Sequence, residues 1–130
     1  MSEGTSMVQE FMDAAGQKTH QNMDTNLFSF RMCLVAEEFK ELAESGGDLL
    51  GNFDDTSLEE KTIRQEQVLK ELCDCIYVLK GMAVTFGWDV DEAFERVHDS
   101  NMTKMPFAKT DDGKVMKGPK YEPCNLEGCI

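Results

Sequence analysis

The positions of the prolines constrain the fold of this chain more than any other feature. The chain has 130 residues and three prolines, Pro106, Pro119 and Pro123, all in its last quarter. Because proline breaks a helix interior, the preceding residues are free to form long helices. No run there shows the strict apolar–polar alternation of a half-exposed strand. We therefore predict an all-α fold, a four-helix bundle followed from about residue 105 by an irregular tail.

Four segments before the tail have the apolar periodicity of helices. Cap residues and glycine stops place them at about residues 6–15, 25–45, 58–86 and 90–102. The pair Gly46-Gly47 is expected to end the second helix, which makes residues 48–56 a loop.

The third helix begins with a capping-box signature, Ser57 followed by Glu60, and Asp24 or Thr25 and Asp89 can cap the second and fourth helices. From Leu72 onward the third helix is apolar on nearly every side, which is typical of a buried helix. Three shorter partners would leave part of it uncovered. We therefore expect its surplus apolar surface to be buried against another copy of the chain.

Length and charge narrow the class of protein. A chain of 130 residues favours a single domain, 1–130. Its formal charge of −12 argues against nucleic acid or an anionic membrane as a partner. No segment resembles a membrane span or a signal peptide, and the five cysteines fit a reducing compartment. These features predict a cytoplasmic protein, in the host cytoplasm if the chain is viral.

Two acidic motifs lie where acids are not expected. Glu38 and Glu41 share a helix face with Leu34, and Glu71 and Asp74 lie one turn apart on the apolar third helix. Buried like charges repel and need a counter-charge. Neither motif shows a cation that faces the acids. A divalent metal, Mg²⁺ with Mn²⁺ as a substitute, would suit four carboxylates from two facing helices.

Each motif taken alone could instead be a solvated helix face with salt bridges. The chain could also be a non-enzymatic acidic helical interaction module, whose surplus apolar helix binds a partner. That alternative explains the charge and the helices, but it leaves the acids on apolar faces without a reason.

The two motifs together resemble those of a known family. E-E-x-x-E at Glu37, Glu38 and Glu41, followed by E-x-x-D at Glu71 and Asp74, is similar to the all-α nucleoside triphosphate pyrophosphohydrolases. That superfamily includes MazG-like proteins, dimeric dUTPases and phosphoribosyl-ATP pyrophosphohydrolases. Arg31 before the first motif, residues 100–104, and the tail over 112–123 extend the resemblance to short, single-domain MazG-like proteins.

The resemblance implies hydrolysis of a (deoxy)nucleoside triphosphate to the monophosphate and pyrophosphate. It implies a dimer or a dimer of dimers, with the tetramer favoured, and sites built partly across subunits. The implied metal ligands are Glu38, Glu41, Glu71 and Asp74. Glu37, together with Glu38, would act in catalysis by positioning a second metal or the attacking water.

Substrate contacts are expected from five further residues. By analogy, Asn101 and Lys104 would touch the phosphates or the sugar. Arg31 and Lys117 are cations available for the phosphates, and Tyr121 could stack on a base or anchor the tail. In such proteins the segment 17–28 should line the base pocket, but the sequence does not identify the base.

Overall fold

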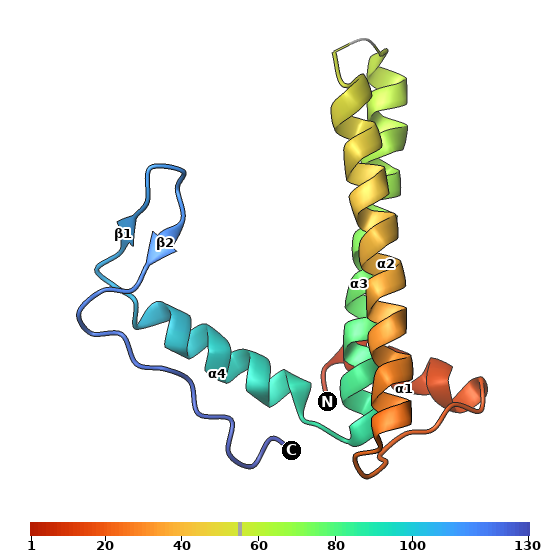
Figure 1. Cartoon of the computed structure of the whole chain (residues 1–130), viewed down its shortest axis with the longest axis vertical. Coiled ribbons are helices and arrows are strands. Elements are labelled where there is room, and N and C mark those ends of the chain that lie inside the picture. Colours follow the sequence, from red (N-terminus) through yellow and green to blue (C-terminus); the bar gives the residue numbers. More distant parts are fainter. Residues whose placement is uncertain (55) are drawn as a thin grey trace. The chain divides into compact units, whose positions relative to one another are not determined.

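The computed structural model describes residues 1–54 and 56–130, and these form four helices and two short strands (Figure 1). The elements are α1 (Glu3–Ala14), α2 (Thr25–Asn52), α3 (Leu58–Phe86), α4 (Val90–Met102), β1 (Ala108–Lys109) and β2 (Val115–Met116). The predicted all-α fold class is therefore confirmed. The chain divides into two compact units, Glu3–Gly87 and Trp88–Ile130 with Met1–Ser2, and each is described by itself.

The first unit consists of the long antiparallel pair α2 and α3, with α1 packed against α3 (Figure 1). Val8 and Met12 of α1 form its buried apolar cluster with Val84 of α3. The segment between α1 and α2 covers the end of α3. There the backbone N–H of His20 donates to the carbonyl of Val84 at 3.0 Å, which satisfies an acceptor that a helix end otherwise leaves open.

The predicted helix boundaries are confirmed at most ends. Asp24 caps α2 by accepting from the Leu27 N–H at 2.8 Å, and Ser57 caps α3 by accepting from the Glu60 N–H at 3.2 Å. Gly87 ends α3 in the left-handed conformation, with φ of +68°.

The predicted end of α2 is wrong, because the helix continues through Gly46-Gly47 to Asn52. Residues 48–52 are helical instead of forming a loop, and residue 55 lies outside the described residues. A glycine in a helix interior costs about 1 kcal/mol relative to alanine. Pairing with α3 offsets this cost, and an ion pair of 3.4 Å between Arg64 and Asp48 joins the two helices beyond the glycines.

The prediction that α3 is buried is confirmed only near its C-terminal end, where the residues from Ala83 to Phe86 are buried. Earlier on the helix, three apolar side chains are largely exposed in the single chain: Leu72 at 43%, Ile76 at 44% and Leu79 at 52%. The structure therefore shows the surplus apolar surface that the sequence predicts.

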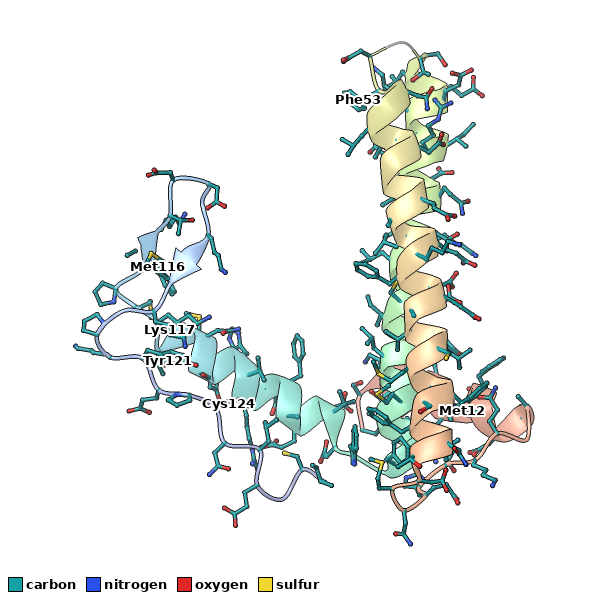
Figure 2. All side chains as sticks on the ribbon, viewed as in Figure 1. Met12, Phe53, Met116, Lys117, Tyr121 and Cys124 are labelled. Carbon is teal, nitrogen blue, oxygen red and sulfur yellow. The ribbon has the colours of Figure 1, made fainter. Side chains whose placement is uncertain are left out.

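The second unit consists of α4 and the tail, which folds back along that helix (Figure 2). Arg96 of α4 donates to the carbonyls of Asn125 and Glu127 at 3.1 and 2.7 Å. The tail is not wholly irregular as predicted, because β1 and β2 pair in antiparallel register. Strands of two residues are too short to give an alternation signal. Within the described parts of the chain, no helix is long and apolar enough to cross a membrane.

Candidate metal and substrate site

Four carboxylates converge between α2 and α3. Each of Glu38, Glu41, Glu71 and Asp74 offers one oxygen, and these oxygens all lie within 4.8 Å of one another. We call these four residues the carboxylate cluster. The i, i+3 spacing puts two acids on one side of each helix, and the antiparallel pairing turns those sides toward each other.

Two oxygens of the carboxylate cluster are buried without a partner. Glu71 is only 5% exposed, and its Oε1 accepts from Gln67 Nε2 at 2.6 Å. Its other oxygen, Oε2, and Oε2 of Glu38 are buried and have no hydrogen-bond partner among the described residues. Because an unsatisfied buried acceptor is costly, these oxygens indicate a site that is completed by a cation or a donor.

The electrostatics of the cluster favour a bound cation. Burial raises the pKa of Glu38, and the negative charges of Glu41, Asp74 and Glu71 raise it further. The pKa rises because the ionised form has lost water and faces like charges. A divalent cation would relieve both effects, and carboxylate oxygens are the ligands that Mg²⁺ and Mn²⁺ prefer.

One cation that lies outside the two motifs faces the cluster. Lys70 Nζ lies 2.8 Å from Asp74 Oδ2 and 3.7 Å from Glu71 Oε1. The hydrogen bond to Asp74 and its charge raise the pKa of Lys70. Lys70 and Asp74 are spaced i, i+4, a signal that the sequence contained. Its side chain is 62% exposed, and a single lysine leaves most of the charge of four carboxylates uncompensated.

The remaining predicted residues of the first unit do not join the cluster. Glu37 is exposed on α2 and is not one of the four converging acids. Arg31 is buried, with Nη2 donating to Gln17 Oε1 at 3.2 Å and lying 3.4 Å from Met12 Sδ. Burial lowers the pKa of Arg31. The interior position of Arg31 could not be read from α2 alone, because α1 supplies the residues that cover it.

Two predicted lysines of the second unit gather around the ring of a third predicted residue, Tyr121. Lys117 Nζ lies 4.7 Å and Lys104 Nζ 6.0 Å from the centre of the Tyr121 ring, and Lys117 and Tyr121 are neighbours in Figure 2. Such distances are those of cation–π contacts. Asn101 is exposed on the last turn of α4. The structure thus brings Lys104, Lys117 and Tyr121 together within the unit of α4 and the tail.

An all-α chain with E-E-x-x-E and E-x-x-D acids that converge between two helices fits the class of MazG-like nucleoside triphosphate pyrophosphohydrolases. Residues 6–101 match the family model described as phosphoribosyl-ATP pyrophosphohydrolase, and the chain belongs to this family. Membership implies pyrophosphohydrolase activity on a substrate of the nucleoside triphosphate type. No individual curated protein matches the chain.

Proposed function

We propose that the protein is a metal-dependent enzyme that hydrolyses (deoxy)nucleoside triphosphates to the monophosphate and pyrophosphate. The observation that carries this proposal is the carboxylate cluster with its two unpartnered buried oxygens, on Glu38 and Glu71. An interaction module has no use for buried carboxylate oxygens that lack a partner. A metal-assisted hydrolase needs them as ligands.

The carboxylate cluster is proposed to hold Mg²⁺, or Mn²⁺ in its place. Held by these four residues, the ion would supply neutralisation of the phosphate charge and activation of a water molecule. Glu38 is proposed to accept the proton of the attacking water, a role that a carboxylate beside that water can fill. Glu37 is the next residue on α2 and is exposed, so its carboxylate is available to orient that water or a second ion.

The second unit is proposed to contribute substrate contacts. Lys104 and Lys117 are two of only 13 basic residues in a chain with 25 acidic ones, and both gather at one ring. Their ammonium groups would bind phosphate oxygens, and Asn101 would contact the phosphates or the sugar. The Tyr121 ring offers a face for stacking.

We also propose that the enzyme is a dimer or a dimer of dimers. The supporting observation is the exposed apolar surface of α3 at Leu72, Ile76 and Leu79. Apolar surface concentrated on one long helix is unusual for a monomer and is typical of an interface between copies.

The proposed reaction is tested with a panel of nucleotides in the presence of Mg²⁺ or Mn²⁺. The panel contains the four NTPs, the four dNTPs, dUTP and phosphoribosyl-ATP, the substrate in the family's description. Pyrophosphate and orthophosphate are assayed separately. Release of pyrophosphate with the matching monophosphate is expected. Orthophosphate alone would mean cleavage between the β and γ phosphates, and no release from any nucleotide would refute the proposed activity.

A further inference from the structure

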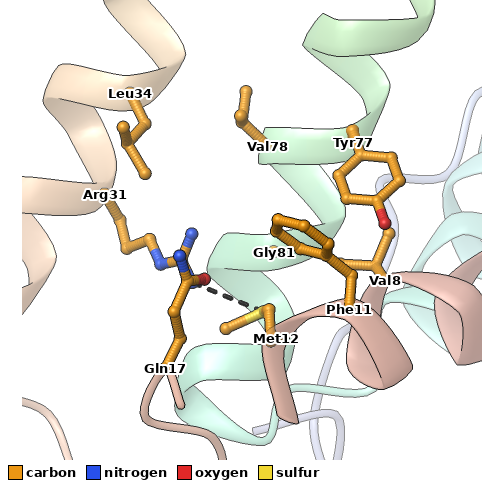
Figure 3. Close-up of a pocket in the computed structure, with 9 residues that line it drawn as sticks. All are labelled: Val8, Phe11, Met12, Gln17, Arg31, Leu34, Tyr77, Val78 and Gly81. Atoms are coloured by element: carbon orange, nitrogen blue, oxygen red, sulfur yellow. Dashed lines mark hydrogen bonds between the residues drawn. The ribbon is translucent and has the colours of Figure 1, made fainter. Parts of the chain in front are cut away.

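A small cavity lies between α1, α2 and α3, beside the end of the α2–α3 pair that α1 covers (Figure 3). Its volume is about 190 Å³, and most of its lining is apolar or aromatic. The aromatic part is an edge-to-face pair, Phe11 and Tyr77, whose ring centres are 5.7 Å apart. The polar groups in the lining come from Arg31, Gln17 and the Tyr77 hydroxyl. We call this cavity the Arg31 pocket.

Arg31 is a buried cation whose hydrogen-bonding capacity is not filled. It is 5% exposed, and its Nε has no hydrogen-bond partner among the described residues. Its contacts are Gln17 Oε1, the weak acceptor Met12 Sδ, and the Phe30 ring at 6.0 Å. No carboxylate of the described chain pairs with it, although arginine stays charged at neutral pH. A buried guanidinium in this state indicates a ligand that supplies acceptors.

The pocket presents more donors than acceptors. Gln17 Oε1 already accepts from Arg31 and keeps one lone pair, the Gln17 Nε2 hydrogens are donors, and the Tyr77 hydroxyl can donate or accept. Gly81 of α3 lets the guanidinium lie close, because a Cβ at that position would be 3.2 Å from Arg31 Nη1. The ligand that fits is flat enough for an apolar, aromatic pocket and carries adjacent acceptors.

The pocket and the carboxylate cluster lie on the same seam between the helices. On α2, Arg31 precedes Glu38 by seven residues, and on α3, Gly81 follows Asp74 by seven. Seven residues are two helical turns, which places the two sites roughly 10 Å apart along the seam. An extended nucleotide spans a comparable distance from its base to its phosphates. A substrate with its phosphates at the cluster could therefore place its base in the pocket.

We propose that the Arg31 pocket selects the base of the substrate by two adjacent acceptors. Guanine presents such a pair at O6 and N7, and cytosine presents one at O2 and N3. Adenine places its amino donor beside both N1 and N7, and uracil and thymine place N3–H between their two carbonyls. The enzyme should therefore prefer guanine or cytosine nucleotides and disfavour adenine nucleotides.

This inference rests on the proposed function. Binding of free nucleosides tests base selection separately from the proposed hydrolysis. Deoxyguanosine, deoxycytidine, deoxyadenosine and thymidine lack phosphates, so their binding in EDTA, followed by calorimetry or NMR, reports on the pocket without the metal. We expect deoxyguanosine or deoxycytidine to bind at least about 10-fold more tightly than deoxyadenosine, as a bidentate contact predicts. The values of kcat/KM for the four dNTPs with Mg²⁺ should follow the same order.

The matched variants are Arg31→Met, which removes the donors but fills similar space, and Arg64→Gln as the control. Arg64 is also a partly buried arginine of the helix pair, but it pairs with Asp48 outside the pocket. We expect Arg31→Met to stay folded, since it removes an unpaired buried charge. In this variant the Kd values of the four nucleosides should lie within about three-fold of one another. Arg64→Gln should keep the wild-type order.

Three outcomes would overturn the base-selection proposal: no nucleoside binding at millimolar concentration, a preference for adenine, or an unchanged preference in Arg31→Met. If the nucleosides are discriminated as expected but no triphosphate is hydrolysed, the proposed reaction fails and the base pocket stands. If triphosphates are hydrolysed without discrimination, the reaction stands and the pocket assignment fails.

Discussion

The α2–α3 pair contains two sites of opposite charge, and each has buried polar atoms without a hydrogen-bond partner among the described residues. At the carboxylate cluster, four acids converge, and two of their oxygens lack a partner. Two turns along the seam, Arg31 is a buried cation without a carboxylate partner among the described residues. The carboxylate cluster requires a bound cation, and the Arg31 pocket requires hydrogen-bond acceptors. A nucleoside triphosphate with its metal carries both, so one substrate would satisfy the two sites together.

The two sites differ in what builds them. The carboxylate cluster requires only the register of two helices, because each helix supplies two acids one turn apart. The Arg31 pocket also requires α1, which supplies Met12 and Phe11, and the segment after it, which supplies Gln17. The first site is therefore decided by local periodicity, and the second by the docking of an element distant in sequence.

The largest expected effect is the loss of turnover when one cluster acid is neutralised. Glu38→Gln and Asp74→Asn should each lower kcat by about 1000-fold or more, since a lost ligand weakens the metal that stabilises the transition state. Pyrophosphate release measures this. The folded state should be as stable as that of the wild type or more so, because a repelling charge is removed.

Glu44→Gln is the matched control for these variants. Glu44 lies on α2 near the cluster, but it is exposed and pairs with Lys40 at 3.9 Å. Exposed pairs of this kind contribute little, so activity and melting temperature should stay close to those of the wild type. Full activity in Glu38→Gln or Asp74→Asn would show that the cluster is not the metal site.

Much of the cluster could be predicted from the sequence, and the reasons are local. Periodicity placed all four acids on the facing sides of their helices, and caps such as Asp24 and Ser57 set the helix starts. The end of α2 was predicted wrongly because Gly46-Gly47 signals a stop, whereas pairing with α3 carries the helix onward. Arg31 was expected to meet phosphates, and its burial follows from α1 packing that one helix cannot reveal.

A smaller effect is expected from Mg²⁺ on the melting temperature, and it tests the cluster without an activity assay. A ligand at ten times its Kd stabilises the folded state by about 1.4 kcal/mol. For a domain of this size that is a shift of roughly 5 °C. Millimolar Mg²⁺ should therefore raise the melting temperature of the wild type and leave that of Asp74→Asn nearly unchanged. If Mg²⁺ does not change the melting temperature of the wild type, the interaction module is favoured. If Mg²⁺ raises the melting temperature of Asp74→Asn as much as that of the wild type, the metal binds elsewhere.

The smallest expected effect is a pH dependence of the metal-free protein. The pKa of Glu38 is raised in the folded chain by burial and by its acidic neighbours, so at neutral pH its charge opposes folding. As the pH falls through that raised pKa, Glu38 takes up a proton in the folded state before it does so in the unfolded chain. The wild type should therefore gain stability relative to Glu38→Gln as the pH falls from neutral toward the ordinary glutamate pKa.

This prediction is checked by melting temperatures in EDTA. Glu38→Gln should melt at a higher temperature than the wild type at pH 7, and the difference between the two should narrow toward pH 5. Glu44→Gln should follow the wild type throughout. A gap that stayed constant or widened would mean that the Glu38 charge is already compensated in the folded protein, and the cluster would then have no need of a cation.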